Sequence, residues 1–451
     1  MSPADPSPAA PPPSAGPAAS TRSTSSSQST QSTQSTVPVG AAATVVVMLW
    51  ALGTLVGEGV AQAGAGAAIL LALVAWRRWR LAPDLRRWAA ASLALTAWQA
   101  LSPLLSVALG TAAQLPRASR WFQSLDTSAA LALACVVALG AVPWRALGWT
   151  LCVGWLLQAA MGLFQFLVRW PFGSLGPLHL PLYRLHDNFG SPGGPERYAG
   201  MGFFFHRLRY AHGAVAVLGP AVAVAAWATV RRVRVAAVVL VVALIGCTYL
   251  SFARAALGAG LVVVLAAVLA MLKGRGRAAA IASLALVALA LVASPAWRHR
   301  LALVPEHLAG GDRSLAMGVG LQVAQKSPLL GVGFGEYKFL ARPLNPRTDV
   351  TGDLLSIDAH NLLLTVWAET GLVGLALFLA QHLLLAAALW RRARAGSLVA
   401  AGALLSLLSF HVLGGVHYLP YHTGVMLAFS FAWGLGLAPD APGLPPAAKP
   451  S

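Results

Sequence analysis

The chain has 451 residues, of which 57% are hydrophobic and only 10% are charged, and its formal net charge at pH 7 is +18. Soluble domains carry about 25% charged residues, so this composition excludes a soluble globular protein and indicates a membrane protein. In a soluble protein such a positive charge would suggest a nucleic-acid partner. Here the Lys and Arg residues stand between apolar runs, so we expect no nucleic acid and assign the charge to membrane topology and to an anionic substrate.

The two ends of the chain differ from the rest. Residues 1–39 are a tract rich in Ser, Thr, Pro and Gln that cannot bury a core, and we predict that this tract and the tail 439–451 are disordered. The residues before the first apolar run carry only Arg22, so the basic region of a signal peptide is missing and the run is expected to be retained. Residues 40–438 are predicted to form one polytopic transmembrane domain.

A bilayer span needs about 20 apolar residues, and runs of this kind follow one another along the domain. We therefore predict an all-α polytopic membrane protein with about twelve transmembrane helices. The predicted spans are 41–57, 61–76, 88–110, 127–142, 146–168, 212–230, 235–250, 254–272, 278–294, 361–389, 397–414 and 422–438.

Charge separates the loops into two sets. The short loops around residues 77–87, 145, 231–234, 273–277 and 391–394 are rich in arginine, which predicts that they and both termini are cytoplasmic. The long loops 169–211 and 295–358, the second partly helical, then lie outside the cytoplasm. The same alternation puts a group of cations and one histidine on the extracytoplasmic face: Arg197, Arg207, Arg209, Arg254, Arg313 and His360.

His360 stands at the start of the tenth run, in the stretch Asp358-Ala359-His360-Asn361. The run is too long for a plain crossing, which predicts a helix that projects about 15 Å from the hydrocarbon or tilts strongly. Two roles for His360 are open. It could be a structural residue at a helix start capped by Asp358, or a general base for a sugar hydroxyl. Glu369 falls roughly on the opposite helix face and is expected to be structural.

The arginines also have two interpretations. Arg254, in Ser251-Phe252-Ala253-Arg254, begins a span and could reach lipid headgroups or bind a phosphate in the bidentate way that guanidinium favours. Asp312 is predicted to cap the helix that carries Arg313 in its first turn. Arg197, Arg207 and Arg209 are secondary candidates for an anionic headgroup.

No cofactor or metal is expected. The pair His206 and His212 lacks nearby carboxylates, and the outer loops lack a dense acidic cluster. The stretch Gly331-Val332-Gly333-Phe334-Gly335 lacks the spacing of a dinucleotide-binding motif and is predicted to be a tight turn.

From about residue 200 to 375 the chain resembles the O-antigen ligase/polymerase superfamily of lipid-linked glycan transferases. Three pieces carry the resemblance: Leu250-Ser251-Phe252-Ala253-Arg254, the run from Arg313 to Gly335, and His360-Asn361 with Glu369-Thr370-Gly371. It implies that His360 is the base, that Arg254 and Arg313 bind the diphosphate, and that transfer inverts the sugar without a metal.

The resemblance also implies the partners and the location. They are a glycan on a polyprenyl (undecaprenyl) diphosphate, a lipid A-core acceptor and the surrounding lipids, at the periplasmic side of the bacterial inner membrane. Ligation of O-antigen is favoured, and an O-antigen polymerase or a protein O-oligosaccharyltransferase would need the same donor chemistry. A transporter is disfavoured because charges are nearly absent from the span interiors.

Overall fold

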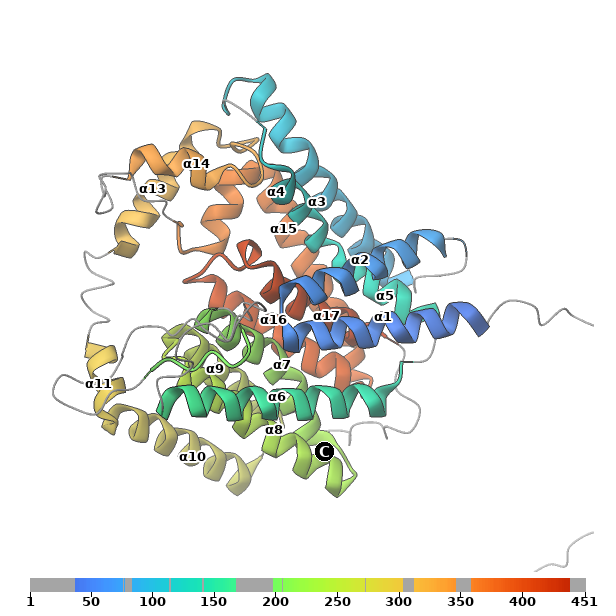
Figure 1. Cartoon of the computed structure of the whole chain (residues 1–451), viewed down its shortest axis with the longest axis vertical. Coiled ribbons are helices and arrows are strands. Elements are labelled where there is room, and N and C mark those ends of the chain that lie inside the picture. The colour runs from blue at the N-terminus through green and yellow to red at the C-terminus, as the bar shows by residue number, and fades with distance from the viewer. Residues whose placement is uncertain are drawn as a thin grey trace, which may run out of the picture. The chain divides into compact units, whose positions relative to one another are not determined.

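A computed structural model describes residues 37–75, 77, 83–112, 115–139, 142–167, 198–204, 206–271, 273–302, 312–345 and 358–438. The regular elements of this part of the chain are helices (Figure 1). The predicted all-α class is therefore confirmed for these residues. The predicted disordered tails lie outside them, except that residues 37–39 begin the first helix.

A helix lies over each of the twelve predicted runs. These helices are α1 (Val37–Val56), α2 (Glu58–Val74), α3 (Pro83–Ala108), α5 (Ala129–Leu139), α6 (Trp144–Leu167), α7 (Arg207–Trp227), α8 (Arg231–Leu250), α9 (Arg254–Met271), α10 (Gly274–Ala293), α15 (Leu362–Arg394), α16 (Leu398–Gly414) and α17 (Thr423–Gly436). Six of them, α1, α3, α6, α7, α8 and α15, are long and apolar enough to cross a membrane, and a pair bent by 52° that ends in α5 would make a seventh. Twelve crossings therefore stay a prediction.

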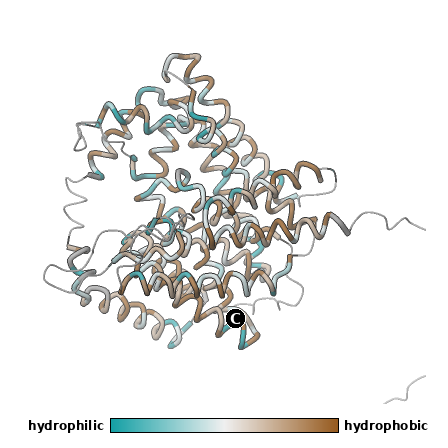
Figure 2. Tube along the Cα trace, in the orientation of Figure 1, coloured by the Kyte–Doolittle hydropathy of each residue, from teal (hydrophilic) through white to brown (hydrophobic). Residues whose placement is uncertain are grey.

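Shorter helices lie between these. They are α4 (Ala118–Phe122), η1 (Gln123–Thr127), α11 (Pro295–Ala302), α13 (Asp312–Lys326), α14 (Tyr337–Ala341), η4 (Arg342–Leu344) and η5 (Leu419–Tyr421). Four of them, α11, α13, α14 and η4, fall in the second predicted long loop. Figure 2 shows hydrophilic residues in α13 and α14, whereas α1 and α6 are largely hydrophobic.

The helices that lead to the candidate site pack together. Helix α7 lies against α8, α9, α16 and α17, and α15 lies against α3, α13 and α16. Most side chains of α7 and nearly all of α17 are buried. Helix α7 begins at Arg207 rather than at the predicted residue 212, because the Nδ1 atom of His206 caps it by accepting from the Leu208 amide at 3.1 Å.

Helix α15 is broken at Gly371, which has φ 66° and ψ −174°. The glycine-rich turn docks on this break: the amides of Val332 and Gly333 donate to the carbonyls of Ala368 and Glu369 at 2.9 and 2.8 Å. The turn thus satisfies carbonyls that the break leaves without helical partners. The tight turn predicted for this stretch is confirmed. In place of one straight projecting or tilted helix, the tenth run forms two helical segments joined at a glycine.

Candidate functional site

His360 directly precedes the cap of α15 and has a left-handed backbone with φ 52°. The cap is Asn361, whose Oδ1 atom accepts from the Leu364 amide at 2.9 Å. Asp358 therefore does not cap this helix, because its carboxylate lies 2.9 Å from the Nζ atom of Lys338. The cap considered for Asp358 is thus supplied by Asn361 instead.

Two non-glycine residues in the described part of the chain have a positive φ, His360 and Phe252. A bulky residue in this region is unusual, and such backbones gather at functional sites. The ring of Phe252 is fully buried between Phe166 and Trp297, with centroids 5.7 and 5.9 Å away. Arg254 follows it as the first residue of α9. One of the two outliers is therefore His360 itself, and the other lies two residues before Arg254.

A second histidine, His417, lies beside His360. The centroid of its ring is 6.2 Å from that of His360, with the planes at 77°, and 5.0 Å from that of His212. The pKa of His417 is lowered to about 3, mostly by burial and to a smaller extent by the neighbouring His360, Arg313, His422 and Arg207. The ring of His360 therefore lies beside an uncharged imidazole on which the charges of Arg313 and Arg207 also act.

His422 lies near the same group. Its pKa is lowered to about 4, mostly by burial and also by the charges of Arg209, Lys338 and Arg120, which Asp358 opposes. Positive charge from three separate segments, α4, α7 and α14, therefore acts at this point. A surface with so many cations around neutral imidazoles is suited to an anionic ligand.

The remaining arginines fall into different surroundings. The Nη1 atom of Arg207 donates to the carbonyl of Ser251 at 3.2 Å, which ties the start of α7 to the turn that leads into Arg254. Arg209 forms an ion pair with Glu58 of α2, so its guanidinium joins two helices. Arg197 lies outside the described residues.

Glu369 is completely buried and holds two segments against α15. Its Oε2 atom accepts from the hydroxyl of Tyr418 at 3.1 Å, and its Oε1 atom accepts from the Tyr337 amide at 3.4 Å. Burial and this carboxylate raise the pKa of Tyr418, so the hydroxyl stays a donor. These are the contacts of the structural carboxylate that the sequence predicted.

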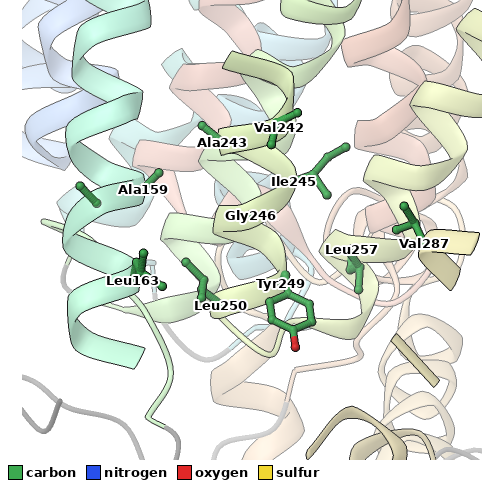
Figure 3. Close-up of a pocket in the computed structure, with 11 residues that line it drawn as sticks. Ala159, Leu163, Val242, Ala243, Ile245, Gly246, Tyr249, Leu250, Leu257 and Val287 are labelled. Carbon is green, nitrogen blue, oxygen red and sulfur yellow. The ribbon is translucent and has the colours of Figure 1, made fainter. Parts of the chain in front are cut away.

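An apolar groove runs along α8 toward the same region (Figure 3). It has a volume of about 490 Å³, with residues of α6 on one side and Leu257 and Val287 on the other. Tyr249 and Leu250 stand at one end, directly before the turn that carries Ser251 and Arg254. The hydroxyl of Tyr249 lies 3.5 Å from that of Ser294. The groove therefore leads from an apolar surface to the cationic turn.

Sequence reasoning missed His417, Tyr418 and His422. All three lie in the short linker between α16 and α17, and His422 is also the first residue of the last predicted span. The alternation of spans puts this linker on the same predicted face as His360, and two histidines in one polar linker were a usable signal. Among the described residues, no three His, Cys, Asp or Glu side chains form a group that could hold a metal ion.

Comparison with known proteins agrees with the resemblance read from the sequence. Residues 239–379 match the family model described as O-antigen ligase. The matched segment contains Arg254, Arg313 and His360, whereas the linker with His417 follows it. No curated protein matches the chain significantly.

Proposed function

We propose that this chain, whose residues 239–379 form a domain of the O-antigen ligase family, transfers a glycan from a polyprenyl (undecaprenyl) diphosphate to a lipid A-core acceptor. The reaction takes place at the periplasmic side of the bacterial inner membrane, which the chain crosses about twelve times with both termini in the cytoplasm. The observation that supports the proposal is the His360 ring, whose centroid lies 6.2 Å from that of His417, in a place where the charges of Arg313 and Arg207 also act.

In the proposed reaction, neutral His360 takes the proton of an acceptor hydroxyl while the hydroxyl oxygen attacks the anomeric carbon of the donor sugar. The new C–O bond forms as the bond from that carbon to the diphosphate oxygen breaks on the opposite face. The diphosphate leaves with the electron pair, and the sugar configuration inverts. A positioned base of this kind contributes about 10²–10⁴-fold to a rate.

The arginines neutralise the leaving group. Arg254 and Arg313 bind the diphosphate by paired guanidinium contacts, and Arg207 assists from the start of α7. Arg197 stays a secondary candidate. Arg209 is proposed to orient α7 through Glu58 rather than to bind the donor, because its guanidinium is paired. No metal is required, because protein cations supply the charge.

The hydrocarbon tail of the donor is proposed to lie in the groove along α8. The groove is apolar and ends beside the turn that carries Arg254, so one lipid could place its tail in the groove and its diphosphate on the arginines. This arrangement matches the two chemical halves of a polyprenyl diphosphate.

The lipopolysaccharide bands of a deletion strain test the proposal. Loss of all long-chain bands with accumulation of lipid-linked polymer is expected for a ligase. A single-repeat band would instead indicate an O-antigen polymerase. Unaltered bands would point to a protein O-oligosaccharyltransferase or a transporter.

A further inference from the structure

The linker between α16 and α17 brings His417 to the centre of the candidate site. Its ring lies between those of His360 and His212, and both Arg207 and Arg313 act on it. His212 is fully buried, so it closes the inner side of His417. His417 therefore fills the space between the helix that starts after His360 and the core of α7.

The position of His417 is fixed through its neighbour. The hydroxyl of Tyr418 donates to the Oε2 atom of Glu369 at 3.1 Å, and Glu369 is itself completely buried. Because Glu369 lies in the segment of α15 between its start, just after His360, and the break at Gly371, this hydrogen bond ties the linker to the helical segment that follows the base. A shift of the linker would move His417 relative to His360.

His417 is poorly suited to be a base itself. Titratable or charged groups from each neighbouring segment lie near His417. They are His212 and Arg207 on α7, Arg313 on α13, and His422 in the same linker. The cations among them oppose a second positive charge. An uncharged ring packed edge-on is, however, well suited to fix the orientation of another imidazole.

We propose that His417 is a positioning residue for His360: its uncharged ring fixes the imidazole of the base edge-on, and the Tyr418–Glu369 hydrogen bond holds that ring in place. This inference rests on the proposed function, because it takes His360 as the base. It concerns a linker that lies outside the segment matched by the family model.

Replacement of the ring tests the proposal by transfer assays on purified protein in detergent. His417→Ala should lower kcat about 10²-fold with little change in donor KM, since small misplacements of a catalytic group have effects of this size. His417→Phe restores an uncharged ring and should recover activity to within about threefold of wild type. Tyr418→Phe removes only the anchoring hydroxyl and should lower kcat about 2–10-fold.

His411, near the end of α16, provides a matched control in the same region of the chain. His411→Phe changes a histidine of α16 whose ring contacts Phe378, His382 and Phe410 rather than His360. It should leave kcat unchanged. Melting temperature and binding of polyprenyl diphosphate, measured on every variant, identify any variant that has merely unfolded.

The pH profile gives a readout that a structural role alone would not move. A carboxylate in His417→Glu would stand about 6 Å from His360 and favour its protonated form, so the acid limb of kcat should move upward by about one to two pH units. His417→Phe should leave that limb in place. An unmoved limb in the Glu variant would overturn the proposal.

Two further results would also overturn it. If His417→Phe is as inactive as His417→Ala, the nitrogens of His417 act on substrate and the residue is catalytic. If His417→Ala retains wild-type kcat, the ring has no positioning role. Neither result touches the proposed function, which fails separately if removal of the His360 imidazole leaves transfer intact.

Discussion

His360 combines a left-handed backbone with a partly exposed side chain at a helix start. The helix cap is supplied by Asn361 and the nearby ion pair by Asp358, so neither depends on the imidazole. Loss of the imidazole should therefore affect chemistry far more than folding.

We expect His360→Asn to fold like wild type and to lose about 10²–10⁴-fold in transfer rate, because Asn tolerates a positive φ but cannot act as the base. His360→Gly is the matched control for the backbone, since it relieves the left-handed strain and should be at least as stable as wild type. Transfer assays and melting temperatures check both variants. Wild-type transfer by a well-folded Asn variant would falsify the assignment of the base.

The arginines should act on binding rather than on proton transfer. Arg254→Lys keeps the charge but loses the planar two-pronged contact, so transfer should still fall substantially. Arg254→Ala and Arg313→Ala should weaken binding of polyprenyl diphosphate by about 1.5–3 kcal/mol per lost contact, less where water replaces it. His360→Asn should bind normally.

A direct binding assay on these variants separates the two roles. Normal binding by both arginine variants would move the diphosphate elsewhere and make Arg207 and Arg197 the next residues to change. Weak binding by the histidine variant alone would reverse the roles assigned here.

At the scale of elements, the break in α15 and the glycine-rich turn form one unit. A Cβ atom on Gly371 would lie 2.2 Å from the carbonyl oxygen of Leu329, and one on Gly331 would lie 2.3 Å from that of Glu369. The two backbones therefore pack so closely that only glycine fits. This contact fixes the direction of the segment of α15 that precedes Gly371, and with it the position of His360 just before that segment.

We expect Gly371→Ala to destabilise the protein, because the residue would need a left-handed backbone, which costs about 1–2 kcal/mol, and would also clash with Leu329. The control is Gly318→Ala: this glycine is exposed in α13, and a Cβ atom there meets nothing within 4 Å. The control should be neutral or slightly stabilising. Melting temperatures in detergent measure both. Equal stability of the two variants would contradict the close packing.

At the scale of the whole molecule, the excess of positive charge has two uses. Some arginines flank the apolar runs, where charge is predicted to set the membrane orientation. Others gather around His417 and His422, where they oppose protonation of both histidines. A site built in this way carries the charge that a diphosphate donor needs.

We therefore expect the purified protein to keep its transfer activity in excess chelator, because protein cations take the place of a metal. The assay compares initial rates with chelator alone and with added divalent ions. Activity that is lost with chelator and restored by one ion would contradict the arginine model and direct attention to Asp353, Asp358 and Glu369. Asp353 lies outside the described residues.

Hydropathy alone predicted the helical class, the twelve apolar runs and the helix that starts after His360, because these features depend on residues close in sequence. The turn at Gly331–Gly335 was predictable for the same reason, because closely spaced glycines indicate a backbone that turns with positive φ angles. Capping by Asp358 was one of two interpretations, and it is wrong. Asp358 and Asn361 are both good capping residues, and only the structure shows that Asp358 pairs with Lys338 while Asn361 caps the helix.

Only the tertiary structure decided which polar residues meet. The Arg209–Glu58 pair joins residues 151 positions apart, and the Tyr418–Glu369 hydrogen bond joins the linker between α16 and α17 to α15. The break at Gly371 likewise depends on the turn that docks on it. Sequence patterns indicate which side chains of a segment are apolar enough to be buried and where the segment ends. They do not record which segment ends pack together, because that choice depends on side-chain shape and on hydrogen bonds between distant segments.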